Sequence, residues 1–442
     1  MKKRREPVSR RACREQLEQK RLGCELVRVV RRYFPGLLPS LKAITDKRHP
    51  SYIKYGKHVL LMTRILSAIF YISSMRKTSE EFNTEKVIKN IGYVCGENLS
   101  EVPYWETINE YLKTVPTAEL QKVIHDLVRE LIRSRAFEEA RIRGKYWQVI
   151  VDGTQLASSP RKLDGECLYR VHHRGTEKEY TEYYYYVLEA KLYLHKNIYV
   201  SIMTEFVENS NPEAEKQDCE IQAAKRLMER LKERFPMLPV CISADSLYAC
   251  ESMIEMCKKH HWAYIIRYKK GSIPSVYEEY QSLRELEQNG REYQTGGLRC
   301  WYDHVNGIEY RGHPVNVLEY EDSEGKYFCF LTNLPITEKN RKDLLEDGRR
   351  RWGIENQGFN TQKRQGYALE HLFSRNYQAV KNHYLLIQIG HMISQILEAW
   401  EKLWKRIQQS REQKHRRLLE SWKNDLLAEH FTEDIGYQIR LS

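Results

Sequence analysis

The stretch Tyr146-Trp-Gln-Val-Ile-Val-Asp152-Gly-Thr154 marks the point at which the character of the chain changes. Its apolar run predicts a buried β-strand, and the acid and glycine at its end predict a turn. A second run, Val240-Cys-Ile-Ser-Ala-Asp245, also ends in an aspartate. If the two strands are neighbours, both carboxylates emerge at the same edge of a sheet. Taken singly, Asp152 is explained as a turn former and Asp245 as a helix cap.

The pattern around these runs predicts the order strand, strand, strand, helix, strand, helix, strand. After the first strand we expect a hairpin, a helix, the Asp245 strand, a second helix and a last strand, over residues 188–206, 213–235, 240–245, 248–260 and 262–268. The first three strands should pair antiparallel, and helical crossovers should then add parallel strands. The sequence therefore predicts a mixed α/β sheet flanked by helices.

Five segments are expected along the chain. They are a helical, basic N-terminal region that binds DNA (1–144), the first part of the α/β core (145–271), a β-rich insertion (272–332), the rest of the core with a third acid (333–399) and a basic helical tail (400–442). The insertion is predicted from short alternating runs separated by Gly and Asp turns.

A helix predicted over Glu346–Arg364 carries the third acid, Glu355. Arg351 precedes Glu355 by four residues and should share its face, and Lys363 follows about two turns later. A carboxylate between cations suits a site that holds a metal ion beside a phosphate backbone. The simpler interpretation is an exposed helix with surface ion pairs.

Three carboxylates around one point would repel one another and raise their pKa values, and a divalent cation removes that conflict. Hard oxygen ligands favour Mg²⁺ or Mn²⁺ over Zn²⁺. Two such ions can activate a water or a 3′-hydroxyl and stabilise the oxygen that leaves a phosphodiester. Nearby phosphate would be bound by basic side chains, namely Arg350, Arg351, Lys363 and Arg364.

The net charge and the spacing of the cysteines indicate the kind of partner and the cellular compartment of this protein. The 442 residues carry a net charge of +12, and residues 1–34 hold twelve Lys or Arg against four Glu, which is 12 − 4 = 8 of that excess. Such a segment attracts a polyanion such as DNA or RNA. The ten cysteines form no CxxC pair, and no apolar run is long enough for a signal peptide or a membrane span. We therefore expect a cytoplasmic protein in a reducing compartment, nucleoid-associated when it is bound to DNA.

Three blocks carry a resemblance to a known family: Val151–Thr154, Ser243–Tyr248 and Arg351–Lys363. Over about residues 145–395 the sequence resembles insertion-sequence transposases of the Asp-Asp-Glu class, which have an RNase-H-like catalytic core interrupted by a β-rich insertion. The resemblance implies that Asp152, Asp245 and Glu355 are the catalytic metal ligands. A Tyr, Arg, Glu and Lys signature of that family branch is matched here by Arg351 and Glu355, whereas Gly348 and Gln362 stand at its Tyr and Lys positions.

The resemblance also implies cut-and-paste transposition. Water would cleave the 3′ end at each transposon terminus, and the freed hydroxyl would attack target DNA. The partner would be double-stranded DNA, bound at terminal inverted repeats by a homodimer on paired ends. Some relatives stack a Trp on a flipped base, for which Trp352 and Trp301 are the candidates; Trp352 also joins the expected DNA-binding set.

Other interpretations remain at this stage. Strand-end carboxylates also suit a glycoside hydrolase, although a neutral sugar requires no arginines. A relative that only binds DNA would retain the basic segments without catalysis. Asp218 and Glu220, at the start of a helix, are interpreted as structural because acids favour a helix N-terminus. Zinc at Cys250, Cys257, His260 and His261 is the less favoured alternative to simple packing.

Overall fold

The strand β1 (Trp147–Ser159) lies at the centre of a sheet in the computed structural model, which describes residues 10–209, 217–399 and 409–431. On one side β1 pairs antiparallel with β3 (Tyr180–His195), and on the other it pairs in parallel with β5 (Val240–Ala244). β4 (Ile198–Val207) pairs antiparallel with β3, and β6 (Ala263–Arg267) pairs in parallel with β5. The order β4–β3–β1–β5–β6 confirms the predicted mixed α/β sheet of RNase-H-like type.

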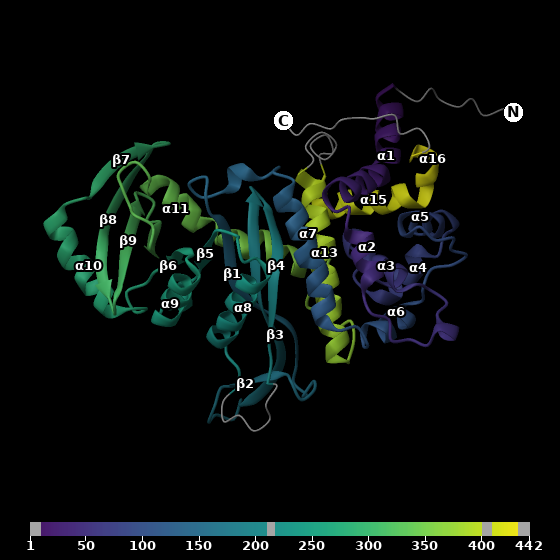
Figure 1. Cartoon of the computed structure of the whole chain (residues 1–442), viewed down its shortest axis with the longest axis horizontal. Coiled ribbons are helices and arrows are strands. Elements are labelled where there is room, and N and C mark those ends of the chain that lie inside the picture. Colours follow the sequence, from purple (N-terminus) through teal and green to yellow (C-terminus); the bar gives the residue numbers. More distant parts are fainter. Residues whose placement is uncertain (1–9, 210–216, 400–408, 432–442) are drawn as a thin grey trace. The chain divides into compact units, whose positions relative to one another are not determined.

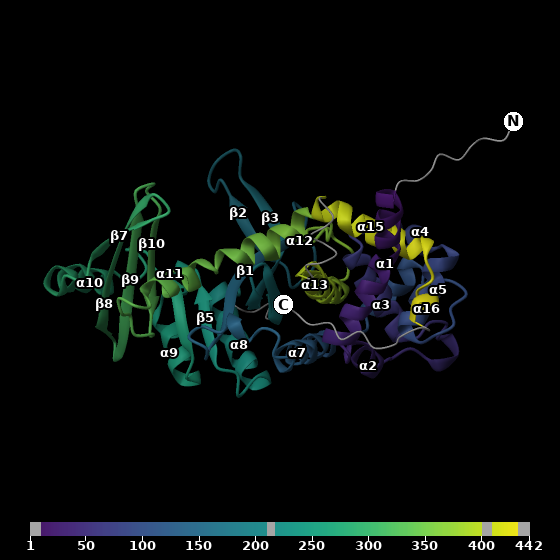
Figure 2. The ribbon, with the colours of Figure 1, turned by 90° about the horizontal axis from the view of Figure 1, so that it is seen from above.

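The crossovers are the helices α8 (Glu220–Arg234) and α9 (Glu251–His260). They cover one face of the sheet, and the helical segment 341–359, which begins with α11 (Arg341–Arg349), covers the other (Figure 2). Because both faces are covered, the strands read as continuous apolar runs rather than alternating ones. A short strand, β2 (Leu168–His172), pairs with the start of β3 and was not predicted.

The predicted β-rich insertion begins with a helix, α10 (Pro274–Glu287), and continues as four strands. These are β7 (Arg291–Thr295), β8 (Leu298–Tyr310), β9 (His313–Asp322) and β10 (Tyr327–Thr332). β10 pairs antiparallel with β6, so that the insertion extends the central sheet to ten strands instead of forming a separate one (Figure 1).

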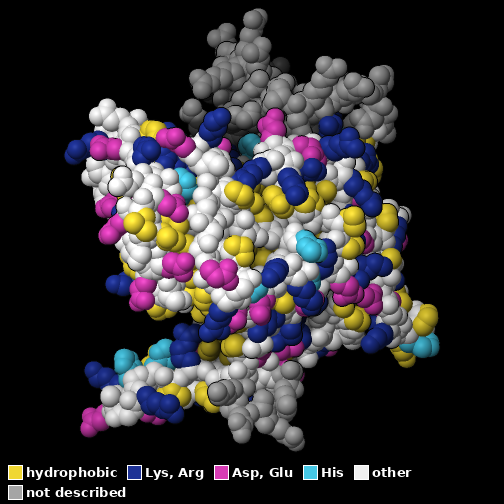
Figure 3. Space-filling model, turned by 60° about the vertical axis from the view of Figure 1, so that its left-hand side comes forward, with side chains coloured by type: hydrophobic (Ala, Val, Ile, Leu, Met, Phe, Trp, Pro, Cys, Tyr) yellow, Lys and Arg dark blue, Asp and Glu magenta, His cyan; other side chains and the backbone are white. Residues whose placement is uncertain are grey.

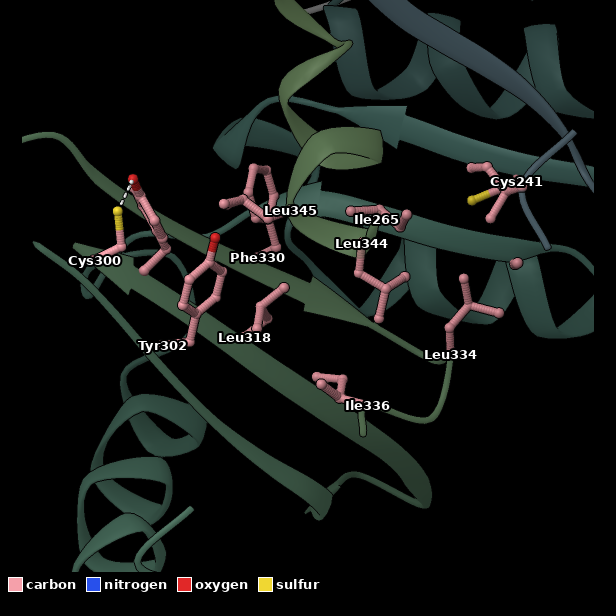
Figure 4. Close-up of a cluster of buried hydrophobic side chains, with 13 residues drawn as sticks. Cys241, Ile265, Cys300, Tyr302, Leu318, Phe330, Leu334, Ile336, Leu344 and Leu345 are labelled. Carbon is pink, nitrogen blue, oxygen red and sulfur yellow. Dashed lines mark hydrogen bonds between the residues drawn. The ribbon is translucent and has the colours of Figure 1, made fainter. Parts of the chain in front are cut away.

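A single apolar cluster joins the insertion to the core (Figure 4). Cys241 and Ile265 come from the core strands, Leu318 and Phe330 come from the insertion, and Leu344 comes from the helix that follows. All five side chains are at most 3% exposed. The insertion and the core therefore share one hydrophobic interior.

The helix predicted over Glu346–Arg364 is broken into three pieces. α11 (Arg341–Arg349) ends first, a π-helix η4 (Ile354–Phe359) follows, and α12 (Asn360–Arg364) completes the segment. A π-helix closes its hydrogen bonds five residues apart, and short π segments recur at functional sites. The prediction of one regular helix is therefore wrong. The regular α-helical spacing that was expected to place residues of this segment on a common face is wrong with it.

By their contacts the residues group into two compact units, 137–359 and 1–136 with 360–442. The second unit is helical: α1 (Arg10–Tyr33), α2 (Leu37–Ala43), α3 (Lys57–Ile69), α4 (Met75–Phe82), α5 (Glu85–Cys95), α6 (Trp105–Leu112), α7 (Thr117–Arg133), α12, α13 (Tyr377–Ala399), α15 (Arg411–Asn424) and α16 (Leu427–Phe431). Its centre is α13, which is buried along nearly its whole length. The division into five segments stays a prediction.

Both ends of the described chain contribute to this helical interior. Gly23 of α1 donates its N–H to Ser421 Oγ of α15 at 3.1 Å, and Trp422 of α15 is 1% exposed. The second half of α1 and the helix α15 are therefore packed elements and not free basic tails. The first basic residues (1–9) and the start of the expected tail (400–408) lie outside the described residues. Among the helices described, none has the length and apolar character needed to cross a bilayer.

Candidate active site

The strand register brings Asp152 and Asp245 together. β1 and β5 are parallel, with Trp147 opposite Val240 and Ile150 opposite Ser243. Two residues further along, the same register sets Asp152 opposite Asp245, which directly follows β5, whereas β1 continues past Asp152 to Ser159. The prediction that the first strand ends at Asp152 is therefore wrong. The expectation that these two strands are neighbours is therefore confirmed.

Each aspartate also makes a local hydrogen bond. Asp245 Oδ1 accepts from the Leu247 N–H at 2.8 Å and so caps the short 3₁₀ helix η3 (Ser246–Tyr248). Asp152 Oδ1 accepts from the Gly153 N–H at 2.9 Å. The capping role considered for Asp245 is real, whereas the turn expected at Asp152 is wrong, because β1 continues through Gly153 and Thr154. Each hydrogen bond occupies only one carboxylate oxygen and leaves the other for the site.

Charge and burial act together on Asp152. Burial raises its pKa to about 6, the Arg351 guanidinium opposes the rise, and the negative charges of Asp245 and Glu220 add to it. Arg351 Nη1 lies 3.5 Å from Asp152 Oδ2. Burial is the main cause of the raised pKa, and a bound cation would offset both the burial and the smaller repulsion from Asp245 and Glu220. The donors are hard oxygens, so this pair fits Mg²⁺ or Mn²⁺.

The helical segment 341–359 crosses the face of the sheet on which Asp152 lies. Gln148, four residues before Asp152 and on the same face, donates to the backbone oxygen of Asp347 at 2.6 Å. Further along, Ile150 packs with Ile354 and Phe359 of η4. This packing brings η4, and Glu355 with it, onto the acid-bearing strand.

Glu355 itself is exposed on η4. Within residues 10–209, 217–399 and 409–431, no three His, Cys, Asp or Glu side chains converge closely enough to hold a metal ion. The arrangement therefore joins Asp152 and Asp245 as a pair, with Glu355 carried nearby on a packed helical segment. The role of all three as metal ligands stays a prediction.

Glu220 is the acid that the sequence interpretation undervalued. It begins α8, and its carboxylate accepts hydrogen bonds from Tyr186 Oη at 2.8 Å and from Tyr248 Oη at 2.5 Å. Tyr248 ends the turn that Asp245 begins. A Cβ at Gly153 would lie 2.2 Å from Tyr186 Oη, so the residue after Asp152 has to be small. Glu220 thus connects β3, which pairs with the strand that carries Asp152, to the turn that Asp245 begins.

We expect Tyr248→Phe to lower the free energy of unfolding by about 1.5–3 kcal/mol, the range for a hydrogen bond to a charged group. Tyr248 is fully buried, so water cannot replace its hydroxyl at Glu220. Urea unfolding measures the change. Tyr264→Phe is the matched control, because Tyr264 is also buried but its hydroxyl has no partner among the described residues. Equal losses in both variants would contradict a role for the Glu220 contact.

Two more charged residues lie fully buried on β3. Glu189 is directly opposite Asp152 in the sheet and accepts hydrogen bonds from Ser201 and Thr204. Lys191 lies opposite Ile150, under Gly358 of η4, and burial lowers its pKa to about 8 while Glu189 opposes the change. Charged residues two apart in an apolar strand were the sequence signal that could have identified them.

The residues expected to contact DNA differ in their exposure and in their ion-pair partners. Arg350 pairs with Asp347 at 2.6 Å, and Trp352 is 64% exposed. Trp301 is half-buried in β8, with the Arg284 guanidinium 4.9 Å from its ring centroid. In the helical unit, Lys363 pairs with Glu370 at 3.0 Å and Arg364 is exposed. All five stay predictions as DNA contacts.

The two departures from the family signature have physical reasons. A Cβ at Gly348 would lie 2.7 Å from the Phe330 ring, so a tyrosine there would clash. Gln362 is fully buried in the helical unit, where it donates to Gln388 Oε1 at 2.8 Å. Neither position is available to a side chain that reaches a phosphate.

Residues 191–393 match the family described as "Transposase DDE domain". The matched range includes Asp245 and Glu355 and begins after Asp152, and over this range it confirms the resemblance to Asp-Asp-Glu transposases found in the sequence. Among solved structures, the piggyBac transposase in a cryo-EM synaptic complex with hairpin DNA is similar at 12% identity, with a TM-score of 0.42, over 93% of this chain and 82% of that one. No curated protein matches the sequence.

Proposed function

We propose that this protein cleaves DNA strands at transposon ends and joins the freed 3′ ends to target DNA, in a cut-and-paste reaction that depends on a divalent metal ion. The observation that supports the proposal most directly is the alignment of Asp152 with Asp245 on neighbouring parallel strands, within a chain that matches the transposase DDE domain.

In this proposal the carboxylates of Asp152, Asp245 and Glu355 hold the metal. Bound Mg²⁺ or Mn²⁺ would supply Lewis-acid stabilisation of the phosphodiester oxygens and a more acidic nucleophile. Arg351, 3.5 Å from Asp152, would contact a phosphate held beside the metal. Exposed Trp352, next to Arg351, presents an aromatic face on which a base can stack.

The partner in this proposal is double-stranded DNA. The excess positive charge of the chain would supply phosphate contacts, and these dominate affinity and make it salt-dependent. A homodimer on paired ends, and work in the cytoplasm at the nucleoid, complete the proposal.

The test is cleavage of an end-labelled duplex that carries the inverted repeats bordering the gene. We expect nicks with Mg²⁺ or Mn²⁺ and none when EDTA removes the metal, since the carboxylates alone cannot stabilise the leaving oxygen. Binding without metal should weaken as salt rises. Tight, salt-sensitive binding without any metal-dependent nick would instead indicate a relative that only binds DNA.

A further inference from the structure

A pocket of about 600 Å³ opens at the end of the sheet opposite to Asp152 and Asp245. Its walls are the residues just before β1, the start of β6, the second half of α9, the start of β9 and the link after β10. All of these belong to residues 137–359 and hence to one compact unit.

Every charged side chain that lines this pocket is basic. Arg143, Lys145 and Lys258 contribute positive charges, His261 and His313 add two imidazoles, and no Asp or Glu is in the lining. On the face of the molecule seen in Figure 3, Lys and Arg side chains are interspersed with acidic ones. The lining of the pocket, by contrast, holds basic side chains without any acid.

None of these cations forms an ion pair with a carboxylate in the described part of the chain, although burial raises the pKa of Asp347 and the charge of Arg143 opposes that rise. Arg143 Nη2 donates to the Pro335 backbone oxygen at 2.6 Å, and Lys258 Nζ lies 3.4 Å from the Gly312 oxygen. Lys145 Nζ lies 4.7 Å from the ring centroid of Tyr146. The helix dipole alone favours cations at the end of α9, which would account for Lys258. It does not account for Arg143 and Lys145, which come from a different segment.

Two residues of the lining also carry buried donors that lack a hydrogen-bond partner among the residues described. Trp262 Nε1 and Tyr264 Oη are the atoms concerned, on side chains that are 3% and 2% exposed. A buried donor without a partner costs about 1–3 kcal/mol, so such groups usually have a reason to be there. Cations and unsatisfied donors that line one pocket are the groups that an oxyanion with several acceptor oxygens requires.

We propose that this pocket binds a phosphate group, presented either by the DNA backbone or by a free nucleotide. Tyr146 at the pocket and Asp152 at the acids are six residues apart on one extended segment, or about 20 Å. A DNA strand that reached both would span about six nucleotides. The proposal that this pocket binds phosphate does not depend on strand cleavage. Only the proposal that the phosphate belongs to a DNA backbone rests on the proposed function.

The experiment compares two double variants of the full chain without divalent metal. Lys145→Ala with Lys258→Ala removes two charges from the pocket. Lys259→Ala with Lys326→Ala removes two charges outside it, from lysines paired with Glu229 and Glu324. The probes are inorganic phosphate, dAMP and a duplex oligonucleotide, measured by calorimetry and, for the duplex, over a salt series. Thermal unfolding checks that both variants are folded.

We expect the pocket variant to bind phosphate and dAMP about tenfold more weakly than the control variant. If the source is the DNA backbone, its affinity for the duplex should also fall, with a salt slope lower by about two. If the duplex binds both variants alike while dAMP does not, the source is a free nucleotide. Equal binding of all three probes by the two variants would overturn the proposal. Because no arm needs catalysis, an inactive wild type would count against the proposed function and leave this result intact.

Discussion

Asp245→Asn is expected to lower the rate of DNA strand cleavage about a thousandfold or more, equivalent to about 4 kcal/mol of activation free energy. The amide removes one negative charge at the position that the strand register aligns with Asp152. It keeps the size of the side chain and can still accept from the Leu247 N–H, because Asn caps helices as well as Asp does. The loss should therefore be in cleavage and not in folding.

Single-turnover cleavage of labelled DNA in Mg²⁺ measures this effect, with thermal unfolding as the check on the fold. Glu251→Gln is the matched control, since Glu251 is an acid on α9 that pairs with Arg311 and lies outside the candidate site. It should cleave as fast as wild type. If Asp245→Asn cleaved within tenfold of wild type, the assignment of Asp245 as a metal ligand would be wrong.

Gly353→Ala is expected to have the second largest effect, because residue 353 immediately precedes the π-helix that carries Glu355. A Cβ there would lie 2.0 Å from Cζ and Oη of Tyr199, whose ring is 6% exposed and packs with Ile150 and Ile354. Overpacking of this kind costs about 1–3 kcal/mol of unfolding free energy. A shift of η4 by about 1 Å should also slow strand cleavage about a hundredfold.

Gly165→Ala is the control for the glycine change, since a Cβ at Gly165 meets nothing within 4 Å. Urea unfolding and strand cleavage should both match wild type in that variant. Adding Tyr199→Leu to Gly353→Ala should remove the clash, so the double variant should be more stable than the sum of the two single losses predicts. Additive losses would show that the contact between residue 353 and Tyr199 does not set the position of η4.

The two strands that lead into the aspartates could be predicted because the signal is local. A continuous buried run followed by an acid can be read directly from Tyr146–Asp152 and Val240–Asp245, and the helix before the second run favours a parallel neighbour. The mixed sheet and the proximity of Asp152 and Asp245 follow from that local signal. The continuation of β1 to Ser159 could not be read in this way, because Gly153 after an acid is typical of a turn.

The remaining features depend on tertiary contacts that leave weak marks in the sequence. An α-helix and a π-helix differ by one residue in their hydrogen bonding, so the pattern of Glu346–Arg364 could not distinguish them. The contribution of Glu220 depends on two tyrosines from distant segments, Tyr186 and Tyr248. Only the fold brings these residues together, and for the same reason the basic pocket was not foreseen.

The pairing of β10 with β6 has a consequence for how this protein could have been shortened or lengthened over time. A lineage that lost residues 272–332 would leave β6 with a row of unpaired backbone amides and carbonyls. Strands of other molecules can pair with such an exposed edge. Selection against such self-association would preserve the inserted strands even where their sequence drifts. The insertion thus covers the β6 edge and would limit self-association of the sheet, independently of any contact with DNA.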